Sequence, residues 1–176
     1  MSRQFHTLFQ NATPREIAGN SFIFRTGDDV VSLHLVEDGC LALERHLESG
    51  VVTCLQRATS GQILAEASIY AHQYHCAARA LAPTRVRSVS VKSFRKALLG
   101  DAELAEDWAR HLAHTVQATR FQAELRSIRT VADRLDAWIG QFGDVPNKGQ
   151  WKSLAAELAV SQEALYREMA RRRVSS

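Results

Sequence analysis

The chain has 176 residues, of which 45% are hydrophobic and 23% charged, with nine glycines and three prolines. This composition is typical of a folded globular protein with one or two small domains, and it argues against disorder, collagen or a low-complexity function. The formal net charge is only +3. Because no run of 18 apolar residues occurs, no membrane-spanning segment and no membrane partner are expected.

The first residues of the chain and the number of cysteines indicate the cellular compartment in which the protein is expected. Residues 1–17 lack the apolar stretch and small-residue cleavage site of an export signal. Cys40, Cys54 and Cys76 are odd in number and far apart, so they predict no disulfide framework. We therefore expect a cytoplasmic protein. Cys40 and Cys54 lie in strand-like apolar surroundings and are expected to be inert core thiols.

Residues 20–91 show the period-two alternation of apolar and polar residues that is typical of short strands. Glycines at 27, 39, 50 and 61 recur every 11 or 12 residues, the spacing at which a rolled antiparallel sheet turns its corners. The pattern predicts a β-roll, to which we assign residues 1–100. The alternating or apolar runs are 31–35, 41–43, 51–55 and 85–91.

From Asp101 the apolar period becomes helical, and no glycine or proline occurs before Gly140. Asp101 is placed to cap the helix, and a break near 127–130 would let Thr130 cap a second one. An unbroken helix over 101–139 would be roughly 58 Å long, too long for one small β domain. A second copy of the helix is the simplest partner for its apolar stripe, although packing as a helical bundle is the alternative. The predicted dimerisation helix, residues 101–129, carries Leu104, Trp108, Leu112, Val116, Phe121, Leu125 and Ile128.

The last segment, residues 130–176, contains the most informative pattern. A short helix over 154–158, a tight turn at 159–161 and a helix capped by Ser161 form a predicted helix-turn-helix. Residues 148–176 hold six basic and three acidic side chains, which suits phosphate contact, while a plain helical hairpin remains the alternative. The outer face of the second helix can reach base edges in a major groove. The candidate DNA-binding residues are Ser161, Gln162, Glu163, Tyr166, Arg167, Arg171 and Arg172.

A glycine-punctuated β-roll, a long helix and a helix-turn-helix resemble the Crp/Fnr family of bacterial transcription regulators, whose name comes from the cyclic-AMP receptor protein and Fnr. The resemblance covers nearly the whole chain and is carried by residues 22–28 (FIFRTGD), 33–39 (LHLVEDG), 61–67 (GQILAEA) and 154–167. It implies an α+β fold with a jelly roll like that of cyclic nucleotide-binding domains, a homodimer, double-stranded DNA as ligand and RNA polymerase as partner. It also implies that a small-molecule effector is possible.

The resemblance further implies an effector pocket, and here the sequence departs from the family. Glu66 matches the glutamate that holds the ribose, but His75 and Cys76 stand where an Arg-Ser or Arg-Thr pair holds the cyclic phosphate. Because a buried phosphate needs a fixed bidentate cation, we expect no ordinary response to cyclic AMP. Arg79 shares the strand parity of His75 and is the one possible deputy. Three separated thiols also fall short of an iron–sulfur ligand set.

Two further departures bear on DNA binding and on ligands. The recognition helix has Gln162 where the family's Arg-Glu-x-x-x-Arg signature begins, and the sequence ends at Ser176, leaving no room for the two-stranded wing that follows in the family. The operator is therefore expected to be related to the usual half-site but different from it. His75 and Cys76 could hold a metal or haem or form a redox-sensing pair, or strand parity could simply point them to opposite faces.

No catalytic triad, paired-acid site, Walker loop or dinucleotide fingerprint is visible, so a non-enzymatic regulator is predicted, with no metal site and no identified cofactor. An effector-independent DNA- or partner-binding dimer with a purely structural roll is the main alternative. A cupin-like metalloprotein is disfavoured, because His34 stands alone and no His-x-His pair occurs.

Overall fold

The computed structural model describes residues 3–174. The chain divides into two compact units, Met1–Leu112 and Ala113–Ser176, which are described separately here. The predictions that involve residues 1–2 and 175–176 fall outside the described residues. None of the helices that the structure describes is both long and apolar enough to cross a membrane.

The first unit contains two antiparallel sheets whose strand orders are β1-β8-β3-β6 and β2-β7-β4-β5. The predicted alternating runs are confirmed as β3, β4, β5 and β8, and the glycines at 27, 39, 50 and 61 all adopt positive φ at the corners. The described strands are β1 (Arg15–Ile17), β2 (Phe22–Phe24), β3 (Ser32–Asp38), β4 (Cys40–His46), β5 (Val52–Thr59), β6 (Ile63–Leu64), β7 (Ala77–Ala80) and β8 (Thr84–Ser90).

Strand alternation divides the apolar residues of the roll between two cores. Val36 of β3 faces the other sheet and packs with Leu41 and Ala78, whereas Leu33 and Leu35 of the same strand face the opposite side. Successive side chains of a strand point to opposite faces, so one seven-residue strand supplies both cores. The sheet that contains β3 is therefore buried on both faces.

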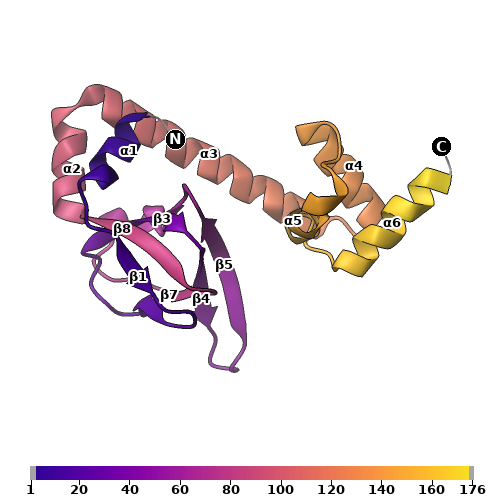
Figure 1. The fold of residues 1–176 in the computed structure, drawn as a ribbon, viewed down its shortest axis with the longest axis horizontal. Coiled ribbons are helices and arrows are strands. Elements are labelled where there is room, and N and C mark those ends of the chain that lie inside the picture. The colour runs from indigo at the N-terminus through magenta and orange to yellow at the C-terminus, as the bar shows by residue number, and fades with distance from the viewer. Residues whose placement is uncertain (1–2, 175–176) are drawn as a thin grey trace. The chain divides into compact units, whose positions relative to one another are not determined.

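Helices cover the outer face of this sheet (Figure 1). They are α1 (Arg3–Gln10), α2 (Val91–Gly100) and the first turns of α3 (Ala102–Ser127), and a short 3₁₀ helix, η1 (Glu66–Tyr70), adds Ile69. Phe94 of α2 makes an edge-to-face contact with Trp108 of α3, with ring centroids 4.9 Å apart. Both side chains are buried, so the start of α3 belongs to the core of the first unit.

Helix α2 lies in a segment that the sequence analysis assigned to the β-roll. Ser90 caps it by accepting a hydrogen bond from the Ser93 amide at 3.0 Å, and Val91 and Phe94 are its buried residues. The change from strand to helix therefore occurs at 91 rather than near 100. The predicted helix start at Asp101 is confirmed, because Asp101 Oδ1 accepts from the Leu104 amide at 3.0 Å.

The apolar stripe of α3 is used within the chain. Leu104 and Trp108 are buried in the first unit, with Leu112 packed against the same cluster, while Leu125 is buried in the second. Phe121 and Ile128 pack against this second cluster, and of the seven stripe residues only Val116 is largely exposed, at 47%. Six of the seven stripe residues therefore pack against the chain's own two cores, and Val116 is the exposed position between them.

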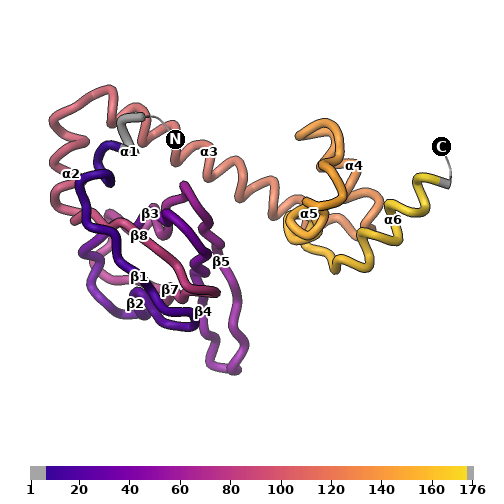
Figure 2. Tube along the Cα trace, in the orientation of Figure 1, coloured from indigo at the N-terminus to yellow at the C-terminus, as the bar shows by residue number. Residues whose placement is uncertain are grey.

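The second unit is helical, and Figure 2 follows its chain from the end of α3 to α6. It contains α4 (Val131–Phe142), a short 3₁₀ helix η2 (Lys148–Gln150), α5 (Trp151–Glu157) and α6 (Gln162–Val174). The predicted break after Ser127 is confirmed, and Thr130 caps α4 by accepting from the Asp133 amide at 3.1 Å. The core is made by Leu125, Leu135, Trp138, Trp151, Leu154, Ala155, Leu158 and Leu165.

The turn between β3 and β4 contains the glycine whose replacement should destabilise the roll most. Gly39 has φ +89°, and a Cβ added there would lie 2.5 Å from Thr84 Oγ1 and 2.6 Å from the Pro83 carbonyl oxygen. We predict that Gly39→Ala lowers the free energy of unfolding by about 3 kcal/mol or more, because backbone strain and steric overlap add. Gly27→Ala, at φ +89° with open space, should cost only about 1 kcal/mol. Chemical denaturation of both variants measures this difference, and equal losses would contradict the packing argument.

Candidate nucleic-acid interface and effector region

Helices α5 and α6 are joined by the turn 158–161, as the sequence predicts. Ser161 Oγ accepts a hydrogen bond from the Ala164 amide at 3.1 Å, so this residue caps α6. Ala159 has φ 52° and makes the sharp turn. Leu154, Leu158 and Leu165 are the buried apolar residues that the two helices share. Val160 and Met169 pack against the same cluster.

The polar side chains at the start of α6 face solvent. Gln162, Glu163 and Arg167 are exposed, and Tyr166 retains 40% of its accessible surface. The Tyr166 ring makes an edge contact with Trp151 at 5.0 Å, and Lys148 Nζ lies 5.8 Å from its centroid. Tyr166 is thus oriented from one side, while the first turns of α6 form an open polar surface. Lys148, which the sequence analysis did not single out, borders this surface.

The basic residues at the end of α6 differ in their surroundings. Arg171 and Arg172 both donate to the buried Glu168, at 2.9 and 2.7 Å from their Nε atoms, and hold the pKa of Glu168 down to about 2. Arg172 also donates to Asp136 at 2.6 Å and to the Ala132 carbonyl at 3.0 Å. Arg172 therefore ties α6 to α4, and this internal role is one that the sequence analysis did not anticipate for a predicted phosphate contact.

Arg134 holds the turn from the other side. Its Nε donates to the Ile128 carbonyl at 2.8 Å, and one terminal nitrogen donates to the carbonyls of Leu158 and Ala159 at 3.0 and 2.9 Å. The acceptors follow the ends of α3 and α5, where carbonyl groups have no partner within their own helix. The Arg134 guanidinium thereby fixes the turn 158–161 relative to the end of α3.

In the β-roll, Glu66 is buried and hydrogen-bonded within the chain. Its two carboxylate oxygens accept from Gln56 Nε2 at 3.0 and 3.3 Å. Gln56 Oε1 in turn accepts from the Ala65 amide at 3.2 Å. A side chain of the chain itself therefore satisfies the carboxylate that the resemblance assigns to a ribose.

His75 and Cys76 point to different environments. His75 is exposed, whereas Cys76 has no exposed surface and belongs to the core between the two sheets. Burial raises the pKa of the Cys76 thiol, which keeps it protonated and unreactive. Within the described residues no hydrogen bond joins Glu66, His75 and Cys76, and of the three only His75 is exposed. Both His75 and Cys76 lie in the bend before β7, and their different exposure agrees with the alternative in which they face opposite sides without sharing a ligand.

Arg79, the possible deputy for the missing arginine, is already paired. Its Nε and a terminal nitrogen donate to Glu44 at 2.9 and 2.6 Å, and the Asn20 side-chain oxygen accepts a third bond at 3.1 Å. Arg79 holds the pKa of Glu44 below its usual range. Because Glu44 is buried, freeing Arg79 would leave an unpaired charge in the protein, which is strongly unfavourable.

Aromatic residues occupy the space between the sheets near Cys76. The Phe24 ring stacks on the Tyr74 ring, with centroids 3.5 Å apart. The His34 ring also stacks with the Phe24 ring, at a centroid distance of 5.9 Å. His34 Nδ1 lies 2.8 Å from Ser88 Oγ. Burial, with a smaller effect of the Arg15 charge, lowers the pKa of His34 to about 4, so the imidazole is neutral at pH 7.

The other cysteines behave differently from each other. Cys54 is exposed, so the prediction that it is a core thiol is wrong, while Cys40 is half-buried and burial raises the pKa of its thiol. Among residues 3–174, no group of three or more His, Cys, Asp and Glu side chains is placed to hold a metal ion.

The first unit is a roll of two antiparallel sheets, and helices follow it. This architecture defines the class of protein to which the chain belongs. Residues 14–101, half of the chain, match the family model described as the cyclic nucleotide-binding domain. The chain belongs to the cyclic nucleotide-binding domain family. No curated protein sequence matches.

Solved structures of bacterial regulators share the fold. FixK2 from Bradyrhizobium japonicum is 17% identical with a TM-score of 0.66, over 93% of this chain and 85% of that one. The c-di-GMP responsive global regulator CLP from Xanthomonas campestris is 16% identical with a TM-score of 0.61, over 97% and 91%. The sensor domain of the transcriptional regulator DNR from Pseudomonas aeruginosa is 21% identical with a TM-score of 0.56, over 73% and 83%.

The Arg172 network predicts a local loss of stability. Arg172→Ala removes charge-assisted bonds to two carboxylates and should destabilise the packing of α6 on α4 by about 2 kcal/mol. Arg171→Ala removes a more exposed contact with Glu168, which solvent screens, and should have a smaller effect than Arg172→Ala. Hydrogen–deuterium exchange of the α4 and α6 amides measures both effects. Equal protection in the two variants would show that Arg172 does not connect the helices.

Proposed function

We propose that this protein is a DNA-binding transcription regulator of the Crp/Fnr type that does not respond to cyclic AMP in the usual way. In this proposal residues 1–100 form a sensor-like roll, residues 101–129 a dimerisation helix, and residues 130–176 a helix-turn-helix domain. The observation that carries the proposal is the capped helix α6, whose Gln162, Glu163 and Arg167 are exposed beside a compact turn. No part of this function requires catalysis.

The chemistry of the α6 surface supports base recognition. Arg pairs with guanine, Gln with adenine, and Glu accepts from cytosine, so three adjacent exposed side chains offer discrimination in a major groove. Tyr166, Arg171, Lys148 and the capping Ser161 lie around them and suit phosphate contact. Arg172 remains a candidate phosphate contact only through the surface that its internal bonds leave accessible, because its side chain is about 30% exposed.

Homodimerisation is part of the proposal, because a two-fold operator requires two reading helices. Val116 is the exposed apolar residue of the α3 stripe and marks the part of the helix that a second copy would cover. Six of the seven stripe residues also serve the chain's own cores, so a dimer contact would be short and centred on Val116. RNA polymerase is the further partner expected of a regulator of this type.

A second candidate is an effector-independent DNA- or partner-binding dimer. It is supported by two internal pairings, Gln56 with Glu66 and Glu44 with Arg79, which occupy the polar groups that an anionic nucleotide would need. In this version the roll is a structural support. The two candidates share the DNA-binding surface and differ only in whether a small molecule controls it.

Arg167→Ala tests base recognition. Against the site selected from random duplex DNA, this variant should lose about 1–3 kcal/mol of binding free energy and relax the preference at one base position. Arg171→Ala is the matched control on the same helix, and it should weaken binding to all sequences alike and reduce the salt dependence by about one charge. Fluorescence anisotropy with the selected and scrambled duplexes measures both. A uniform loss with Arg167→Ala would contradict a base-reading role.

Cyclic nucleotides test the effector region. Without a bidentate cation for the phosphate, the protein should bind cyclic AMP and cyclic GMP with a Kd of about 0.1 mM or weaker. The double variant His75→Arg, Cys76→Ser restores the residue types of the family pattern and should improve the affinity by about tenfold or more. Isothermal titration calorimetry measures each affinity. Micromolar binding by the unchanged protein would overturn the argument from the missing arginine.

A further inference from the structure

An apolar groove lies on the first unit and shares no lining residue with the regions discussed above. It has a volume of about 570 Å³ and runs between the segment before β3 and helix α2. Its apolar lining includes Val31, Val91 and Leu99. Val31 and Leu99 are 65% and 90% exposed. Folding of the chain therefore leaves these two large apolar side chains in contact with water.

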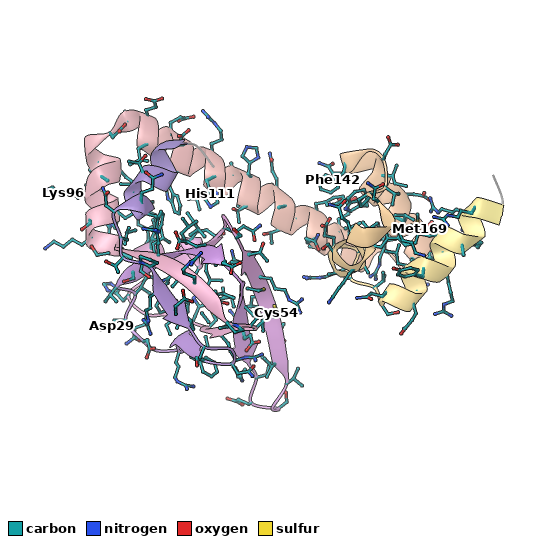
Figure 3. The ribbon with its side chains drawn as sticks, in the orientation of Figure 1. Asp29, Cys54, Lys96, His111, Phe142 and Met169 are labelled. Carbon is teal, nitrogen blue, oxygen red and sulfur yellow. The ribbon has the colours of Figure 1, made fainter. Side chains whose placement is uncertain are left out.

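The rim of this groove is entirely cationic. Lys92, Arg95 and Lys96 line it, and none of the lining residues is acidic. In the described part of the chain, no ion pair joins any of these three to a carboxylate. Arg95 instead lies over the exposed ring of Tyr70, 5.2 Å from its centroid, and Lys96 projects from α2 away from the sheets (Figure 3).

The sequence of α2 explains this arrangement. Val91 and Phe94 face the core, and positions 92, 95, 96 and 99 fall on the opposite side, which is the spacing of one helix face. The helix has no acidic residue that could neutralise its three cations through neighbouring turns. The closest acidic residue in the sequence, Asp101, is used to cap α3. Folding therefore leaves both the positive charges and Leu99 without an internal partner.

We propose that this groove is a docking surface for an acidic amphipathic segment of a partner protein. Leu99, Val31 and Val91 would receive apolar side chains of the segment, and Lys92, Arg95 and Lys96 would pair with carboxylates beside them. The separate cations along about one helical turn match several carboxylates on a peptide better than the single head group of a fatty acid.

The test uses the full chain and a fluorescein-labelled peptide of about 15 residues, with leucines at helical spacing and glutamates between them. Charge reversal of Lys92, Arg95 and Lys96 together should weaken binding about tenfold or more. Leu99→Ser should weaken it about fivefold, because the apolar contact is lost. All four residues are exposed, and only the Arg95 guanidinium makes a described contact, over Tyr70. These variants should therefore keep the wild-type melting temperature.

Two controls separate the proposal from simple charge attraction. Arg45→Glu reverses an exposed basic charge of the same unit outside the groove and should leave the affinity unchanged within about twofold. A peptide with lysine in place of each glutamate should not bind. The proposal is overturned if Leu99→Ser has no effect, or if Arg45→Glu weakens binding as much as reversal at the rim. It is also overturned if phosphatidylglycerol vesicles bind through the same residues and the acidic peptide does not.

Discussion

The second unit depends on one guanidinium group. Arg134 on α4 donates to carbonyls that follow the ends of α3 and α5, at Ile128, Leu158 and Ala159. Carbonyls at a helix end have no N–H donor within their own helix. Burying them without another donor would cost free energy comparable to a lost hydrogen bond. A single fixed, planar donor set meets this requirement at two helix ends together, which a lysine could not do with the same geometry. The position of the turn before α6 therefore follows from α4 as much as from the turn sequence itself.

In the β-roll, too, buried polar groups have hydrogen-bond partners within the chain. Glu66 accepts from Gln56, and Glu44 accepts two bonds from Arg79, so the two carboxylates that are nearly fully buried have donors within the chain. Each pairing removes a group that could bind an external ligand, because a buried carboxylate or its partner cannot be released without leaving the other unpaired. These two pairings, together with the missing phosphate-binding arginine, are the physical basis for proposing little response to cyclic nucleotides.

Local signals in the sequence predicted much of this fold. The alternation over β3 and β8 and the caps Asp101, Thr130 and Ser161 depend on neighbouring residues alone, so a single sequence reveals them. Helix α2 was missed because it follows β8 with no glycine or proline between them and is only ten residues long. Cys54 is exposed together with Val52 and Leu55 at the start of β5, an edge strand of its sheet. An apolar run in one strand does not reveal whether another element covers it.

Periodicity also does not say which surface covers an apolar stripe. Leu104, Trp108 and Leu125 occupy the same helical stripe, yet the first two are buried with Phe94 and the third with Leu135. From the sequence, a second helix was the simplest cover, because the partners within the chain lie in segments whose packing depends on tertiary structure. The polar residues of α6 were placed more reliably, because the cap and the buried Leu165 fix which side of the helix remains outside. The α6 surface was thus predictable from one segment, whereas the role of Arg172 required knowledge of Asp136 and Ala132 on a different helix.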